Sequence, residues 1–112
     1  MIYHVQAKFR GGTAKSLLKK LTDGTIKEQR PDGEELVASM NRAVVNETGN
    51  VEWSETCFCS SPLHHERSTV LDHHFDDITT APIESHTTYR GRPFMEFLVE
   101  SAQLEPATQN PE

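Results

Sequence analysis

Long hydrophobic runs are missing from this sequence, and apolar residues are few overall. Only 35% of its 112 residues are apolar, and the mean hydropathy is −0.60. No segment approaches the roughly 20 consecutive apolar residues that span a bilayer. The opening MIYHVQAKFR alternates and carries charge, which does not match a signal peptide. We therefore expect a cytoplasmic protein with no membrane partner.

Basic residues are also scarce, with 11 Lys and Arg against 17 Asp and Glu. The formal net charge is −6 with histidine neutral, and no run of basic residues occurs. Because nucleic acids are bound through basic faces that contact their phosphates, the composition predicts no nucleic-acid partner. The low apolar content further suggests that a second copy covers part of the surface, or that a disordered tail lowers the average.

Only two cysteines are present, and in a cytoplasmic chain they are expected to be free thiols. Familiar catalytic signatures are absent, since the sequence has no G-x-S-x-G, phosphate-binding loop, dinucleotide fingerprint or H-E-x-x-H motif. The triplet His64-His65-Glu66 does not match the last of these, because its two histidines are adjacent. No cofactor is predicted.

The clearest strand pattern is at the N-terminus, where residues 1–9 alternate between apolar and mostly polar side chains. Gly11-Gly12 ends this run, and Thr13 can cap a helix whose apolar residues follow at three- and four-residue spacing. That apolar stripe is Ala14, Leu17, Leu18 and Leu21. A Pro-Asp-Gly turn at 31–33 closes the unit.

The stretch 51–78 contains both cysteines, the only tryptophan and four of the six histidines. Alternation at its start predicts a strand with one mostly apolar face. That face consists of Val51, Trp53, Glu55, Cys57 and Cys59. Ser60 or Ser61 can cap a helix and Pro62 can begin it, and the spacing of apolar residues extends this helix over 62–77.

Residues 34–46 fit either a helix or a strand. The short Gly-containing loop at 46–50 separates two β-capable runs, which favours a strand and a hairpin. Residues 83–90, rich in Thr, His and Tyr, are predicted to form a last strand. The resulting βαββαβ order is that of a ferredoxin-like sandwich, an α+β fold in which two helices cover one face of a four-stranded antiparallel sheet.

We expect a single domain over residues 1–100 and a disordered tail over 101–112, which holds two prolines and few apolar residues. Just before this tail lies an apolar group that must dock on its own domain or on a partner. Its members are Phe94, Met95, Phe97 and Leu98.

In this topology the first strand lies between the third and the fourth, and its polar side chains face away from the helices. A polar pocket is expected on this open face, with His4 and His86 as candidate catalytic groups, because histidine exchanges protons near neutral pH. The candidate ligand-binding residues around them are Gln6, Arg10, Ser54 and Thr56. Alternatively, the same polar face is a wet dimer interface without catalysis.

A family resemblance rests on the Met1-Ile2-Tyr3 opening strand, the helix, the hairpin, the second helix and a last strand that runs to Arg92-Pro93-Phe94. Over residues 1–98 this layout resembles the dimeric α+β-barrel superfamily and, within it, the YCII-related proteins. The resemblance implies a homodimer with its sheets face to face and a small-molecule pocket. That family carries a His in the first helix and an Asp-Pro pair near the second. This chain has neither, so the family's acid–base residues are not carried over.

Cys57 and Cys59 suggest a different kind of site together with His64 and His65, since thiolate and imidazole bind zinc or copper. Against this, C-x-C on a strand turns both thiols to one face, here the apolar one, where a free cysteine packs as a small hydrophobe. Cys59 also precedes a helix N-terminus that could stabilise a reactive thiolate. The helix expected over 62–77 also carries a polar group that could hold a metal through imidazole and carboxylate. Such a group is more typical of a solvated helix face than of a metal site. It consists of His65, Asp72, His73 and Asp76.

The sequence therefore predicts a small cytoplasmic homodimer that binds a small organic molecule and could act on it by histidine acid–base chemistry. One alternative is a non-catalytic dimerisation or interaction module. The other is a transition-metal-binding protein that uses Cys57 and Cys59 with histidines.

Overall fold

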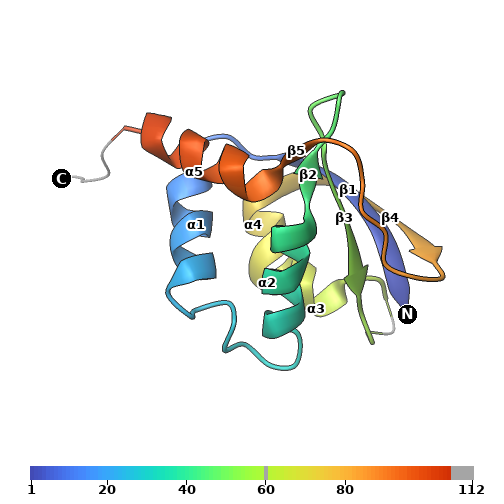
Figure 1. The fold of residues 1–112 in the computed structure, drawn as a ribbon. Coiled ribbons are helices and arrows are strands. Elements are labelled where there is room, and N and C mark those ends of the chain that lie inside the picture. The colour runs from blue at the N-terminus through green and yellow to red at the C-terminus, as the bar shows by residue number, and fades with distance from the viewer. Residues whose placement is uncertain (60, 107–112) are drawn as a thin grey trace.

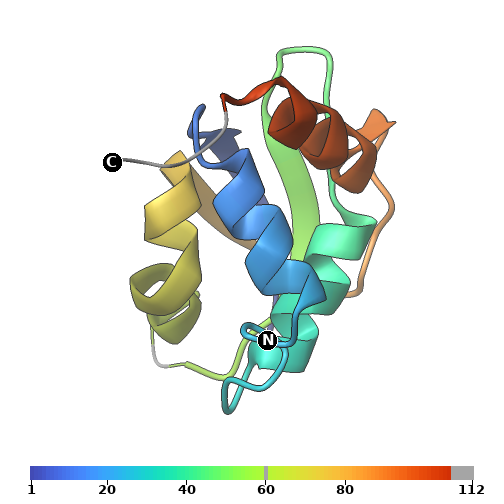
Figure 2. The same cartoon turned by 90° about the vertical axis from the view of Figure 1, so that its left-hand side faces the viewer.

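The computed structural model describes residues 1–59 and 61–106. They form an α+β fold in which a five-stranded antiparallel sheet carries helices on one face (Figures 1 and 2). The strands are β1 (Ile2–Phe9), β2 (Val44–Val45), β3 (Val51–Thr56), β4 (Phe75–Ile83) and β5 (Arg92–Pro93). The helical segments are α1 (Ala14–Thr22), α2 (Gly33–Arg42), α3 (His64–Glu66), the π-helical turn η1 (Arg67–Leu71), α4 (Asp72–His74) and α5 (Phe94–Leu104).

The sheet has the strand order β4-β1-β3-β2-β5, so β1 lies between β3 and β4. Val5 pairs with Trp53 on one side and with Thr80 on the other. Tyr3, Val5 and Ala7 are buried under the helices. The alternation in β1 therefore fixes which face of the sheet is covered, because successive side chains point to opposite faces.

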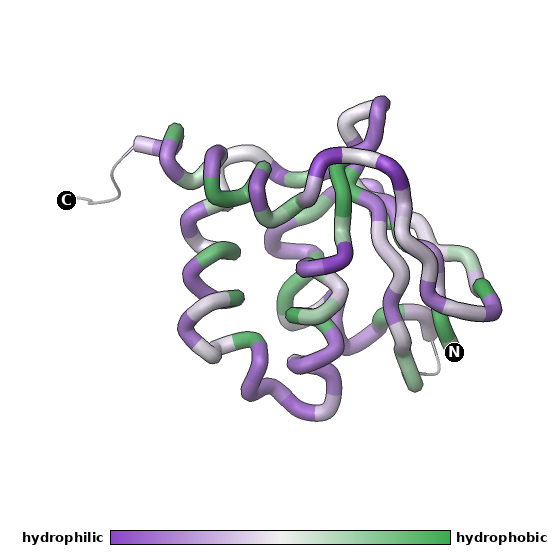
Figure 3. Tube along the Cα trace, in the orientation of Figure 1, coloured by the Kyte–Doolittle hydropathy of each residue, from purple (hydrophilic) through white to green (hydrophobic). Residues whose placement is uncertain are grey.

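Aromatic rings fill the space between the sheet and the helices. Phe75 contacts Trp53 and Phe94, with ring centroids 5.4 and 5.9 Å apart, and Phe9 lies 5.7 Å from Phe75. The predicted apolar group near the C-terminus thus docks on its own domain, with Phe94 and Leu98 fully buried. Figure 3 shows hydrophobic and hydrophilic residues alternating along the helices, as expected for helices that cover a core.

The prediction of a strand over 34–46 is wrong for most of that range. Residues 33–42 form α2, since Leu36 and Met40, four residues apart, are both buried on one face of a helix. The predicted hairpin is confirmed, but its first strand is only Val44–Val45, paired with Val51 and Glu52. The apolar spacings of a helix and of a strand both fit this segment, because α2 is followed directly by the short strand β2 within it.

The prediction of a last strand over 83–90 is also wrong. The strand that pairs with β1 is β4, which begins at Phe75 and ends at Ile83. The predicted second helix over 62–77 accordingly ends at His74, and it consists of three short segments, α3, η1 and α4. The four-stranded expectation fails as well, because β5 adds a fifth strand beside β2.

The predicted tail begins too early, because α5 continues to Leu104. Glu105 then accepts hydrogen bonds from the backbone N–H groups of Ala14 (2.5 Å) and Lys15 (3.1 Å) at the start of α1. The carboxylate caps two helix N–H groups that have no partner inside the helix. Residues 107–112 of the predicted tail lie outside the described residues. No helix in the described ranges is long and apolar enough to cross a membrane.

Candidate functional site

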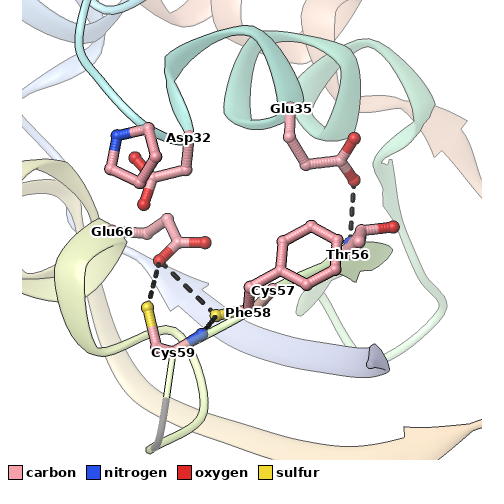
Figure 4. A pocket seen from close by; sticks show the side chains of 8 residues that line it. Asp32, Glu35, Thr56, Cys57, Phe58, Cys59 and Glu66 are labelled. Carbon is pink, nitrogen blue, oxygen red and sulfur yellow. Dashed lines mark hydrogen bonds between the residues drawn. The ribbon is translucent and has the colours of Figure 1, made fainter.

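A pocket of about 300 Å³ lies between the start of α2, the end of β3 and α3. Figure 4 shows two sulfur atoms and a carboxylate facing one another on one side of it, and a second carboxylate on α2 pointing toward β3. We call this site the thiol pocket. Its lining residues are Pro31, Asp32, Glu35, Thr56, Cys57, Phe58, Cys59 and Glu66.

The two sulfur atoms converge on a single carboxylate oxygen. Sγ of Cys57 is 3.8 Å from Oε1 of Glu66, and Sγ of Cys59 is 3.7 Å from the same oxygen. The backbone N–H of Cys59 also donates a hydrogen bond to Sγ of Cys57 (3.3 Å). Both cysteines are free, Cys57 buried and Cys59 half-buried. They follow β3, and their spacing of two turns both thiols toward Glu66, as a strand-like alternation predicts.

Glu66 is wholly buried, although glutamate is almost never buried without a partner. It belongs to α3, which starts after Leu63, a residue with a left-handed backbone (φ 57°). Leu63 is itself fully buried, and its side chain anchors this turn in the core. Within residues 1–59 and 61–106, Oε2 of Glu66 has no hydrogen-bond partner.

A second buried carboxyl group, Glu55, stands behind Glu66. Its Oε1 accepts a hydrogen bond from the Trp53 indole N–H (2.8 Å), and its Oε2 has no partner among the described residues. Burial raises the pKa of Glu55 well above its ordinary value. The Trp53 hydrogen bond opposes this rise, and the adjacent Glu66 carboxylate adds to it. Glu55 therefore favours its protonated, neutral form.

The Cys57 thiol next to this charge is held in its protonated form in the free protein. Burial raises the pKa of the Cys57 thiol to about 11, and the charge of Glu66 contributes to this shift. A thiol of this kind is a weak nucleophile, because the thiolate is the reactive form. A reactive Cys57 is therefore not favoured, whereas displacement of its proton by a bound metal ion remains available.

The opposite wall of the pocket belongs to the start of α2. Oε2 of Glu35 accepts hydrogen bonds from the backbone N–H of Thr56 and from the guanidinium of Arg42, both at 2.8 Å. Asp32 lies 2.9 Å from Nδ1 of His65. Arg42, the basic residue of α2, is therefore bound to Glu35 and does not neutralise Glu66.

The predicted metal group is brought together only in part. Cys57 and Cys59 meet in the thiol pocket, but the imidazole of His65 pairs with Asp32 and His64 lies on a separate exposed surface with Arg67. In the described part of the chain, the group of three or more metal-binding side chains that comes together is Cys57, Cys59 and Glu66, with ligand atoms within 4.8 Å of one another.

The second polar group of the sequence analysis, His65, Asp72, His73 and Asp76, does not converge on one site. Asp72 forms an ion pair with Arg67 (3.1 Å), and Asp76 forms one with Arg10 (2.7 Å). Asp76 lies in β4 rather than on a helix. These acids are thus engaged with arginines near the surface.

On the open face, the structure brings His86 to Ser54 and Thr56. The loop of residues 84–91 crosses this face, and we call it the strap. Ser54 Oγ lies 2.8 Å from Nδ1 of His86, and Thr56 Oγ1 lies 2.9 Å from Nε2. Ser54 is wholly buried beneath the strap. Both ring nitrogens of His86 are therefore occupied by hydroxyl groups.

His4 lies beside this group but has partners of its own. Its Nε2 is 2.6 Å from Oε2 of Glu52, and its ring stacks on Tyr89 of the strap at a centroid distance of 4.7 Å. Gln6 also lies on β1, where its carbonyl accepts a hydrogen bond from Thr79. Arg10, bound to Asp76, lies past the end of β1. Among the described residues, neither Gln6 nor Arg10 forms a hydrogen bond or ion pair with His4 or His86.

Sequence reasoning missed Glu66, Glu35 and Asp32 as pocket residues. A signal was available in Glu55, which interrupts an otherwise apolar strand face. A carboxyl group on such a face must be buried, and buried carboxyl groups are partnered or functional. Two thiols and a buried carboxylate are side chains of the types that bind metal ions. Comparisons of the chain with protein-family models, with curated proteins and with solved structures gave no match.

Proposed function

We propose that this protein binds a small cation in the thiol pocket. The observation that carries the proposal is Glu66, a wholly buried carboxylate beside a second buried carboxyl group, Glu55, with no cationic side chain bound to either among the described residues. A proton on Glu55 removes only one of the two charges. Taking the remaining charge out of water costs several kcal/mol unless a partner compensates it. A cation in the pocket supplies that partner.

Access to the pocket supports the same function. Phe58 lines it and is 91% exposed, which places the pocket at the surface. A volume of about 300 Å³ admits a metal ion with water or a small organic cation. The second wall holds two more carboxylates, Glu35 and Asp32, which are paired with Arg42 and His65.

The first four strands support assignment to the ferredoxin-like class. Their order β4-β1-β3-β2 and antiparallel pairing fit it, and β5 with α5 is then an addition. A homodimer with sheets face to face, implied by the resemblance to dimeric α+β-barrel proteins, would have to form around the strap. Acid–base catalysis by His86 is less favoured than cation binding, because hydroxyl groups occupy both nitrogens of its ring.

The experiment is a thermal-unfolding titration of the full chain with Zn²⁺, Mg²⁺, Ca²⁺, methylammonium and ethylenediamine as probes. At least one probe is expected to raise the Tm of the wild type, since a ligand of the folded state stabilises it. Glu66→Gln should abolish this rise. Glu47→Gln, at an exposed position, is the matched control and should behave as the wild type. A wild-type Tm that no probe raises would contradict the proposal.

A further inference from the structure

We infer that the cation is a thiophilic divalent metal ion of the zinc type, held by Sγ of Cys57, Sγ of Cys59 and the carboxylate of Glu66. This inference rests on the proposed function, because it names the ligand of the same pocket. It differs from the metal site expected from the sequence, since a buried glutamate replaces His64 and His65.

The spacing of the three side chains already suits such an ion. For tetrahedral zinc, bond lengths of about 2.3 Å to sulfur and about 2.1 Å to oxygen put neighbouring ligand atoms roughly 3.6–3.8 Å apart. The observed distances from Glu66 Oε1 to the two sulfur atoms are 3.7 and 3.8 Å. The two sulfur–oxygen separations therefore already match those of a bound ion, and all three ligand atoms lie within 4.8 Å of one another. The ion takes the place of the two thiol protons.

Ligand chemistry selects the type of metal. Thiolates favour zinc, cadmium, cobalt and copper over magnesium and calcium, which prefer oxygen ligands. With two thiolates and one carboxylate, the three ligands carry three negative charges against the two positive charges of the ion. The complex therefore remains slightly anionic, but the buried Glu66 charge gains a direct partner.

The groups around the ligands hold them in place. The backbone N–H of Cys59 donates to Sγ of Cys57, an interaction that stabilises a thiolate. Glu55 stands behind Glu66, and Glu55 is itself held by the Trp53 indole N–H. Outer partners of this kind orient metal ligands and tune their affinity.

Three protein ligands leave a fourth tetrahedral position, which faces the pocket. Sites with three protein ligands and one free position bind water or a small exogenous ligand there. The space beside Phe58, Glu35 and Asp32 accommodates such a group. The free position is thus where a small molecule would meet the metal.

The test is a titration of the metal-free full chain with Co²⁺, in the presence of a phosphine reductant, followed by competition with Zn²⁺. We expect one Co²⁺ per chain, a thiolate-to-metal charge-transfer band in the ultraviolet, and displacement by Zn²⁺. Removal of an outer partner already weakens metal sites by about 10–100-fold, so Cys59→Ser and Glu66→Gln should each weaken binding by about 100-fold or more.

Two controls make the result decisive. His64→Asn and His65→Asn should keep the affinity and the band, which excludes the histidine ligands. Cys59 is half-buried, so Cys59→Ser is preferred to a change at the buried Cys57, and circular dichroism checks that it folds. A wild type without the band overturns the inference, and so does binding that Cys59→Ser leaves unchanged. If an organic ammonium then raises the Tm through Glu66, the pocket still binds a cation and only its metal identity is wrong.

Discussion

The two faces of the sheet handle their polar groups in opposite ways. On the open face, His86 of the strap forms hydrogen bonds with Ser54 and Thr56, and His4 pairs with Glu52. On the helix-covered side, buried polar atoms of Glu55 and Glu66 lack partners among the described residues. Buried polar groups are normally paired, and exceptions call for an explanation. This contrast supports the proposal that the thiol pocket takes a ligand and that the strap makes a structural contact.

The largest loss of stability is expected from a substitution at Gly33, which begins α2 beside the thiol pocket. A Cβ atom there would lie 2.1 Å from the carbonyl oxygen of Ile26 and 2.8 Å from that of Lys27. Gly33→Ala should therefore lower the free energy of unfolding by about 3 kcal/mol or more, because backbone must move. Gly11→Ala, where nothing lies within 4 Å, is the control. Equal stability of the two variants in urea denaturation would show that the start of α2 is not fixed by this contact.

Acid should weaken the helix-covered side through His74, which is 2% exposed and lies 3.2 Å from Nζ of Lys20. Burial, with the Lys20 charge, lowers the pKa of His74 to about 4 from its ordinary value of 6.5. Between pH 6.5 and 4, the unfolded chain therefore binds a proton at His74, whereas the folded chain does not. Stability should fall by on the order of 3 kcal/mol as the pH drops from 6.5 to 4.

The measurement is the free energy of unfolding of the wild type and His74→Asn across this pH range. The variant should show a shallower fall, whereas His64→Asn, at an exposed position, should keep the wild-type slope. Parallel curves for the wild type and His74→Asn would show that His74 does not carry the acid sensitivity.

The stability of Glu66→Gln in the metal-free protein tests most directly whether the helix-covered side carries an uncompensated charge. Removing an uncompensated buried charge should raise the free energy of unfolding by about 1–2 kcal/mol, while cation binding is lost. Such a gain of stability at the expense of binding is typical of functional sites. Chemical denaturation in the presence of a chelator measures it, with Glu47→Gln as the matched control. A less stable Glu66→Gln protein would mean that the carboxylate is a structural group.

The smallest effect is expected on the open face. His86→Ala removes two hydrogen bonds from a side chain that is itself exposed, so the loss should be about 1 kcal/mol. Thr88→Ala, also in the strap and exposed, should be neutral. Cation binding in the thiol pocket should stay unchanged in both variants. If His86→Ala abolishes it, the two faces are coupled and the contrast between them is wrong.

The elements that sequence predicts well are those with one unbroken period. β1 and β3 follow from strict alternation, and α1 follows from its apolar stripe. The segment 34–46 was misread because a helix and a two-residue strand share it. Residues 83–90 have strand-like composition for another reason, since His86 and Tyr89 contact the open face from a loop.

The candidate site could be predicted only in part. Cys57 and Cys59 are visible as a C-x-C pair on a strand face. Glu66 is not, because its approach to the thiols depends on the left-handed turn at Leu63 that precedes α3. Asp32 and Glu35 likewise reach the pocket only through the placement of α2. A charged residue within an apolar strand face, Glu55, was the one local sign of the site.

The central claim is that Glu66 and the two cysteines bind one metal ion. Native mass spectrometry of the full chain, loaded with Zn²⁺ and desalted, tests it beside Glu66→Gln. We expect a mass excess of one zinc per wild-type chain, lost on treatment with a chelator and absent from the variant. A wild-type chain that remains metal-free, or a variant that retains the same zinc, would contradict it.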